Sequence, residues 1–262
     1  MRRLAQNSNR RPDRSRKRSR RHNNGRHTNS PNTHLKTTKT NTQLSTNKKT
    51  PSDWSTFAQE WRTSYLTFTR SIAANPSLPY KTVDQHHYDS LVDLLSTHNL
   101  ANLFTPSQLT NLSLIWHRLA PWPDTNAGLS NLHTNLHLQT ATLTNGNLTL
   151  ITNMVNNSGM PFQHILSAEM FDSYKPNPRV YLGAAAKLGF EPGECAMVAA
   201  HLEDLAAAKE CGFKTVYVER REEERAGHLR EREGLVDVWV REEEEGFVEA
   251  ARKLGSWMNG ER

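Results

Sequence analysis

The pattern of apolar and polar residues divides the chain into a helical section and a section of alternating strands and helices. In residues 52–119, apolar side chains recur every three or four positions, which predicts helices. The first helix ends before Pro76, and its apolar face consists of Trp54, Phe57, Ala58, Trp61, Tyr65 and Phe68. Two shorter helices are expected over residues 84–100 and 106–119. The prolines of Pro121-Trp122-Pro123-Asp124 then end the helical section.

From Leu129 onward, short apolar runs alternate with helical patterns. The runs predict strands over residues 141–144, 162–166, 195–200, 215–218 and 235–240. Helices are expected between and after them, over residues 148–155, 178–188, 204–211 and 247–257. Strands that alternate with helices predict a parallel sheet with right-handed crossovers. The fold class is therefore α/β, with a Rossmann-like parallel sheet and a separate helical section.

Residues 1–50 differ sharply in composition from the rest of the chain. They contain 15 Lys or Arg and one acid, Asp13, and their only apolar residues are Met1, Leu4, Ala5, Leu35 and Leu44. Such a segment cannot bury enough apolar surface to offset the entropy of ordering it, so we expect a disordered basic tail. Residues 51–262 contain 18 Lys or Arg and 26 acids, so the folded part is acidic although the chain's net charge is +6. We interpret the acidic runs Glu222–Glu224 and Glu242–Glu245 as solvated surface.

Cysteine content and hydropathy bear on the compartment. Cys195 and Cys211 lie within expected core elements, where we expect two reduced, buried thiols. No apolar stretch is long enough to cross a membrane, and the basic N-terminus lacks the apolar region of a signal peptide. We therefore expect a cytoplasmic protein without a membrane partner.

Polar clusters follow three of the expected strands. They are Thr144-Asn145-Gly146, Tyr174-Lys175-Pro176 and His201-Leu202-Glu203-Asp204. Because ligands bind beyond the carboxyl ends of the strands in such sheets, a hydroxyl, an ammonium and a carboxylate are expected to converge on one crevice.

Each cluster also has a purely structural interpretation. Lys175, taken alone, is typical of an exposed loop, and His201 is compatible with a loop position. The tripeptide Thr144-Asn145-Gly146 is typical of a turn that caps the following helix. Asp204 is typical of an acidic residue in the first turn of a helix. In the functional interpretation, Lys175 neutralises carboxylates and anchors an anionic substrate. The free N–H groups of the helix after Asn145 bind an anion, and Asp204 orients or deprotonates a water. The shared position of the clusters favours the functional interpretation.

Over residues 51–262 the order and spacing of these clusters resembles the haloacid dehalogenase superfamily, and within it the 2-haloacid dehalogenases, particularly a fungal-like branch. Leu143–Gly146 resembles the second motif of that family, Tyr174–Pro178 with Tyr181 resembles the third, and Val198–Asp204 resembles the fourth. Trp61-Arg62 is similar to the cap-domain pair whose arginine reaches the site. Four motifs in order are specific, although each one alone is weak.

The resemblance implies a division into a tail (1–50), a helical cap (51–124) and a haloacid dehalogenase core (125–262). It also implies a mechanism, in which an aspartate displaces halide from a small 2-haloacid and water hydrolyses the resulting ester. Arg62 and Asn145 would then receive the halide, Thr144 would bind the carboxylate or the nucleophile, Lys175 would hold the charges in register, and Asp204 would help to activate water, with His201 as a further binding residue. No metal or other cofactor is implied; the partner is a small anionic substrate, and a homodimer is allowed.

Two departures from the family pattern affect these expectations. The fourth motif commonly reads Ser-Ser-Asn-x-Trp-Asp, whereas this chain has Ala199-Ala200-His201-Leu202-Glu203-Asp204. The first motif, an apolar strand that ends in the nucleophilic Asp, is not found before Trp61, where only Asp13 and Asp53 occur and neither follows an apolar run. Either the N-terminal segment replaces the true first exon, which we favour because its composition looks unselected, or the protein has lost catalysis.

Two other functions remain open from the sequence. A magnesium-dependent phosphatase of the same superfamily would use adjacent acids such as Glu203-Asp204, although Trp61-Arg62 favours the dehalogenase. Arg10–Arg21 is typical of a nuclear-localisation or RNA-binding segment, which would bind phosphates with little sequence preference. No aromatic residue is interleaved with these arginines to stack on bases, so we expect nucleic-acid binding, if any, only through this tail.

Overall fold

The computed structural model describes residues 49–224 and 234–260. The expected basic tail, including Arg10–Arg21, lies outside the described residues except for its last two positions. Of a first compact unit that ends at Gln59, the structure describes the start of helix α2 (Pro51–Ala74). There the Asp53 carboxylate accepts hydrogen bonds from the N–H and the hydroxyl of Thr50, at 2.6 and 2.8 Å, so it serves the first turn of the helix.

The expected helical section is present, with one addition. Helices α3 (Val83–Thr97) and α4 (Pro106–Ser113) match the two shorter predicted helices, and a 3₁₀ helix, η1 (Leu114–Arg118), completes the second. Capping boxes fix both starts, through Thr82 with Gln85 and Thr105 with Gln108. Helix α5 (Thr125–Thr134) was not predicted.

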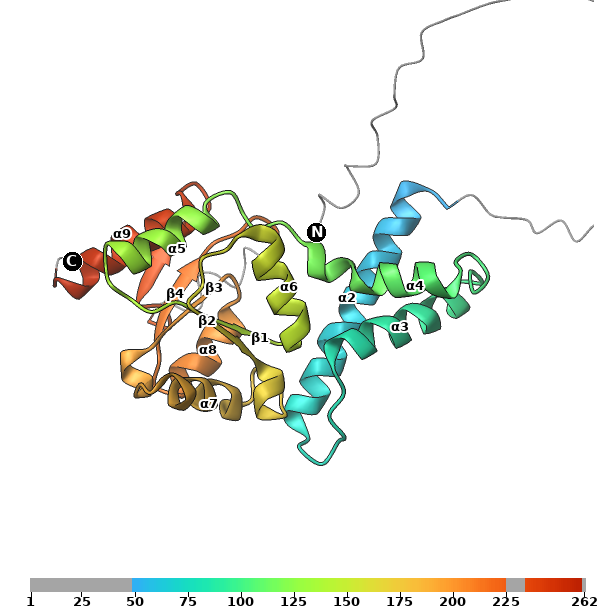
Figure 1. Cartoon of the computed structure of the whole chain (residues 1–262), viewed down its shortest axis with the longest axis horizontal. Coiled ribbons are helices and arrows are strands. Elements are labelled where there is room, and N and C mark those ends of the chain that lie inside the picture. The colour runs from blue at the N-terminus through green and yellow to red at the C-terminus, as the bar shows by residue number, and fades with distance from the viewer. Residues whose placement is uncertain (1–48, 225–233, 261–262) are drawn as a thin grey trace, which may run out of the picture. The chain divides into compact units, whose positions relative to one another are not determined.

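The strands and their intervening helices confirm the predicted alternation (Figure 1). The strands are β1 (Ala141–Thr144), β2 (His164–Ser167), β3 (Ala196–Ala199), β4 (Lys214–Val218) and β5 (Val238–Val240). The α-helices are α6 (Leu148–Ser158), α7 (Pro178–Leu188), α8 (Leu202–Glu210) and α9 (Gly246–Met258). Two short 3₁₀ helices, η2 (Ala168–Phe171) and η3 (Pro192–Glu194), precede α7 and β3. The fold is thus α/β with parallel strands.

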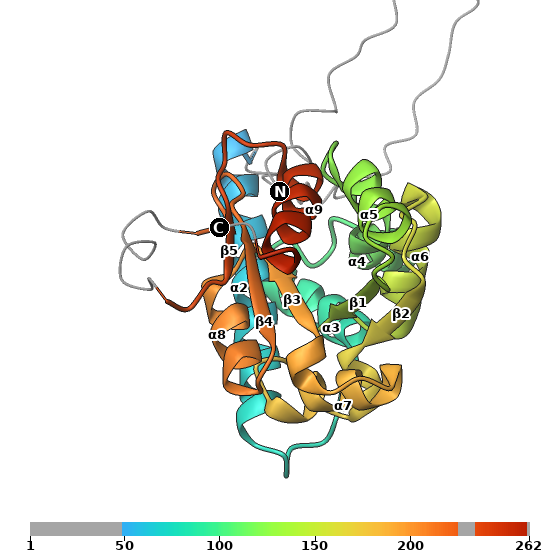
Figure 2. The same cartoon turned by 90° about the vertical axis from the view of Figure 1, so that its left-hand side faces the viewer.

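The parallel strands form two sheets among the described residues. One contains β1 and β2, and the other has the order β3-β4-β5. Figure 2 shows the two sheets with β1 and β3 on the sides that face each other. Leu143 of β1 packs against the core of both sheets, because it contacts the cluster around Leu150 and the cluster around Tyr217. Two of the three polar clusters follow these facing strands: Thr144-Asn145-Gly146 follows β1, and His201-Leu202-Glu203-Asp204 follows β3.

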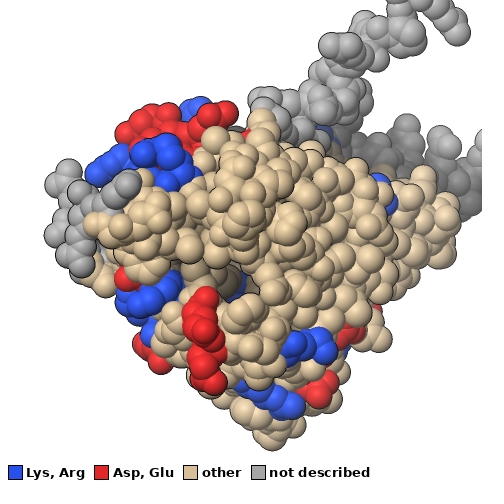
Figure 3. Space-filling model, turned by 60° about the vertical axis from the view of Figure 1, so that its left-hand side comes forward, with Lys and Arg blue, Asp and Glu red and all other residues tan. Residues whose placement is uncertain are grey.

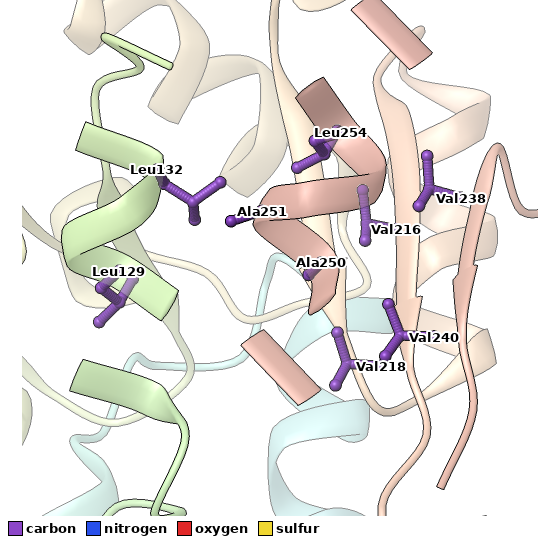
Figure 4. Packing of buried hydrophobic residues seen from close by; sticks show 9 residues of the cluster. All are labelled: Leu129, Leu132, Val216, Val218, Val238, Val240, Ala250, Ala251 and Leu254. Carbon is purple, nitrogen blue, oxygen red and sulfur yellow. The ribbon is translucent and has the colours of Figure 1, made fainter. Parts of the chain in front are cut away.

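Helices α5 and α9 pack against the second sheet through aliphatic side chains (Figure 4). Leu129 and Leu132 of α5 join Leu254 of α9 and the valines of β4 and β5 in one buried cluster. Gly128 permits the close approach, since a Cβ there would overlap the backbone of Phe247. Burial of this kind stabilises the fold by about 25 cal/mol per Å² of apolar surface removed from water. This cluster explains why α5 forms although it contains few apolar residues.

One face of the molecule carries interspersed charges rather than charges of a single sign (Figure 3). On the face shown in Figure 3, acidic and basic side chains lie close to one another and broad areas between them are uncharged. That face therefore lacks the continuous basic surface typical of nucleic-acid binding. In the part of the chain that the structure describes, no helix is both long and apolar enough to pass through a bilayer.

Candidate functional site

Asn145 and Lys175 are joined by two hydrogen bonds. The Asn145 side chain donates through Nδ2 to the Lys175 carbonyl oxygen at 3.1 Å, and its Oδ1 accepts from the Lys175 N–H at 2.7 Å. The amide therefore fixes the Lys175 backbone, with Asn145 directly after β1. The pairing explains how residues far apart in the sequence reach one place, as predicted.

Asp204 meets Lys175 from the first turn of α8. Lys175 Nζ lies 2.5 Å from Asp204 Oδ2, and the side chains are only 14% and 17% exposed. The other oxygen, Oδ1, accepts a hydrogen bond from the Tyr181 hydroxyl at 2.5 Å. Burial and the neighbouring Asp204 carboxylate raise the pKa of Tyr181, so this phenol stays protonated and acts as a donor. An ammonium, a carboxylate and a phenol thus share one partly buried network.

The expected position of Lys175 at the end of a strand was wrong. Strand β2 ends at Ser167, and η2 and a further turn separate it from Lys175. The lysine is held in place by Asn145 and by the burial of its neighbour Tyr174, whose hydroxyl donates to the Lys81 carbonyl at 2.6 Å. Tertiary contacts, rather than register in the sheet, bring Lys175 to the site.

Thr144 and the start of α6 do not form the open anion site that was expected. The Thr144 hydroxyl accepts the Gly146 N–H at 3.0 Å, which closes the turn. The Leu148 N–H at the start of the helix donates to Glu169 Oε2 at 2.6 Å, so an internal carboxylate already occupies this donor. The side chain of the N-cap residue Asn147 does not cap the helix; it bonds to Asp84 instead.

Arg62 and His201 both contact the carboxylate of Glu223. Arg62 Nη2 is 3.2 Å from Glu223 Oε2, and His201 Nε2 is 3.5 Å from the same oxygen. Glu224 is 3.9 Å from His201 Nδ1 and accepts the Leu202 N–H at 2.9 Å. The interpretation of Glu222–Glu224 as solvated surface was therefore wrong for Glu223 and Glu224. Glu244 of the second acidic run likewise binds Lys253, at 2.6 Å.

Tyr65 belongs to the site, although the sequence analysis placed it only on an apolar helix face. Its hydroxyl is hydrogen-bonded to the Asn145 side chain and interacts with the charges of Arg62 and Asp204. Burial raises the pKa of Tyr65 to about 12, so its hydroxyl stays protonated at neutral pH. The spacing could have indicated that Tyr65 lies near the site, because a residue three positions after Arg62 lies on the same side of a helix.

The remaining reactive groups lie elsewhere or are too few for a metal site. Among the described residues, no group of three or more His, Cys, Asp or Glu is placed to hold a metal ion. Cys195 and Cys211 are free thiols, as expected, but both are partly exposed rather than buried. Cys195 directly precedes β3, and Cys211 directly follows α8. These positions at the ends of elements explain why both thiols are partly exposed.

Comparisons with known proteins identify the family of this chain. The haloacid dehalogenase-like hydrolase family matches residues 37–212. The (S)-2-haloacid dehalogenase 4A of Burkholderia cepacia is 32% identical over 107 residues, which are 40% of this chain and 46% of that protein. The (S)-2-haloacid dehalogenase of Xanthobacter autotrophicus is 30% identical over 120 residues, 45% of this chain and 46% of that protein. The chain thus spans just under half the length of these curated relatives.

Solved structures extend the similarity over most of the chain. The L-2-haloacid dehalogenase PA0810 is 32% identical, with a TM-score of 0.67 over 76% of this chain and 85% of that one. The defluorinating L-2-haloacid dehalogenase Rha0230 is 28% identical, with a TM-score of 0.65 over 78% of this chain and 81% of that one. The family match covers more than half of the sequence and includes all three polar clusters. This chain belongs to the haloacid dehalogenase-like hydrolase family.

Proposed function

We propose that this chain supplies the anion-binding and water-handling part of a hydrolase that removes halide from small 2-haloacids. The observation that carries this proposal is the network in which Asn145, Lys175 and Asp204 meet from three separate segments. The dehalogenase names of its relatives support the reaction class. The two partly exposed free thiols favour a reducing compartment, and we propose a cytoplasmic location.

The proposed reaction needs an aspartate as nucleophile. A carboxylate oxygen attacks C2 of the 2-haloacid, and the carbon–halogen bond breaks, with its electron pair leaving on the halide. Water then adds to the ester carbonyl, which releases the 2-hydroxyacid, returns the carboxylate and liberates one proton. In this proposal Arg62 and Asn145 receive the halide, Thr144 binds the nucleophile or the substrate carboxylate, and Lys175 balances the negative charges. Asp204 assists the water, and His201 contributes to substrate binding.

The nucleophile would belong to a strand between the two sheets. Strands β1 and β3 each pair on one side only among the described residues, and the clusters that follow them hold Asn145 and Asp204. A parallel strand between β1 and β3 would end at the same edge, since neighbouring parallel strands share a direction. An aspartate at the end of that strand would face Lys175.

Coexpression tests this proposal directly. The full chain is produced with a segment that carries an apolar strand ending in Asp-x-x-Gly-Thr, and in parallel with the same segment bearing Asn in place of Asp. We expect chloride release from 2-chloropropionate only with the Asp segment, reduced about 10³-fold or more by Lys175→Met. Chloride release by the unassisted chain, or equal release with both segments, would reject the proposal.

A further inference from the structure

Three groups that could bind a substrate anion are already bound to carboxylates of the same chain. Arg62 and His201 contact Glu223, and the Leu202 N–H at the start of α8 binds Glu224. A guanidinium, an imidazole and a helix N-terminus are three features that favour a negative charge. We propose that Arg62, His201 and the α8 N-terminus form a carboxylate-binding subsite and that Glu223 and Glu224 are its internal, competing ligands.

A turn builds this arrangement into the fold. The Glu223 N–H donates to the Arg220 carbonyl at 3.2 Å, and Glu222 between them has a φ of 68°, in the left-handed region that few L-residues adopt. Arg220 is itself held by two hydrogen bonds to Asp124, at 2.9 and 2.6 Å. The turn thus starts from a fixed point and directs its carboxylates back toward α2 and α8.

The contact is weak enough to exchange with a ligand. Arg62 and Glu223 are 28% and 30% exposed, and their one close approach of 3.2 Å is not bidentate. His201 is 47% exposed, so its attraction to Glu223 is screened by water. Ion pairs of this exposure contribute modestly, so a small carboxylate at millimolar concentration can compete with the side chain.

This inference rests on the proposed function, because it regulates the same site. An entering 2-haloacid would meet Arg62 first through its carboxylate, and the departing halide would occupy Arg62 later; either anion can bind Arg62 only after Glu223 has left. The subsite therefore selects ligands with a carboxylate small enough to replace a glutamate side chain. Occupation by Glu223 lowers the affinity for every such anion by a common factor.

Anion titrations of the full chain test the inference without requiring catalysis. Binding of acetate, and separately of 2-chloropropionate, is followed by NMR through the arginine side-chain N–H signals. We expect Glu223→Gln to bind both anions about three- to tenfold more tightly than the wild type, because the amide removes the competing charge. Glu223→Ala is a second variant with the same expected direction.

Two controls isolate the local contact. Glu243→Gln removes the same charge from an exposed position in the other acidic run, and we expect no change in affinity beyond about twofold. A double variant that combines Arg62→Gln with Glu223→Gln should lose the gain in anion affinity. Unchanged or weaker binding in both Glu223 variants, or no anion binding by any variant, would overturn the inference. If tighter binding is found but the complemented chain releases no chloride, the proposed function fails while the inference stands.

Discussion

Two ion pairs with nearly equal burial have different surroundings in this protein. Asp124 and Arg220 are 11% and 12% exposed, and Asp204 and Lys175 are 17% and 14% exposed. Arg220 binds Asp124 through two nitrogens, and the Phe247 N–H adds a third donor at 2.7 Å. The guanidinium also lies over the Trp122 ring at 4.9 Å. Both oxygens of Asp124 therefore accept hydrogen bonds, and an aromatic ring covers the guanidinium of Arg220.

The pair at the site is built differently. Lys175 contacts one oxygen of Asp204, and an ammonium carries three protons, so the contact with Asp204 uses only part of its donor capacity. The other oxygen of Asp204 accepts from Tyr181, a neutral group. A planar, bidentate guanidinium stabilises a structure, whereas a point charge with donors to spare is suited to charges that change during a reaction. The comparison shows that burial alone does not distinguish a fully bonded structural pair from the pair to which we assign the charges of the proposed reaction.

Removal of the structural arginine should have the largest effect on stability. We expect Arg220→Ala to lower the free energy of unfolding by about 3–5 kcal/mol, because it leaves the Asp124 carboxylate buried without its charged partner. Urea unfolding of the full chain, followed by circular dichroism, measures this change. Arg70→Ala is the matched control, since Arg70 pairs with Glu203 at 59% exposure, where such pairs contribute less than about 1 kcal/mol. Equal losses of unfolding free energy in Arg220→Ala and Arg70→Ala would contradict the structural role assigned to Arg220.

Acid should weaken the same pair. Burial raises the pKa of Asp124, but the hydrogen bonds from Arg220 and the Phe247 N–H outweigh it and hold the pKa below its ordinary value of 3.8. A carboxyl whose pKa is lower in the folded state stabilises the fold above about pH 4 and loses this contribution as the pH falls through its folded pKa. At pH 7 we expect Asp124→Asn to unfold more easily than the wild type by about 3 kcal/mol. The difference in unfolding free energy between the wild type and Asp124→Asn should shrink toward pH 2. A difference that does not change with pH would show that the substitution acts through packing and not through the charge of Asp124.

The sequence predicted most elements of the fold because local patterns determine them. Apolar runs bounded by turn residues predicted the ends of β1 and β4 to within one residue. Pro178 and Gly189 correctly indicated the two ends of α7. Helix α5 was missed because its two buried leucines, Leu129 and Leu132, acquire a partner only when α9 folds against them. Gly246 shows the same dependence: its φ is 44°, and a Cβ there would overlap the Asp124 carboxylate.

The candidate site was predictable in part for the same reason. Asn145 and Asp204 follow strands, so the topology of the sheet was sufficient to bring them to one edge. No local pattern indicates the contact of Glu223 with Arg62, which joins residues 161 positions apart. Nor does a local pattern indicate that Tyr65 turns its hydroxyl to Asn145, because an aromatic residue on a helix face is most often part of a core. Such long-range contacts depend on the completed fold.

The hydroxyl of Tyr181 offers the mildest test of the comparison. Tyr181→Phe removes the donor to Asp204 Oδ1 and leaves Lys175 in place, so we expect a loss of only about 1 kcal/mol in the free energy of unfolding. Tyr217→Phe is a matched control, because the Tyr217 hydroxyl is buried without a hydrogen-bond partner among the described residues and its removal should be neutral or stabilising. Thermal and urea unfolding compare the two variants. A loss above about 3 kcal/mol in Tyr181→Phe would place Asp204 with Asp124, as a carboxylate on which the fold itself depends.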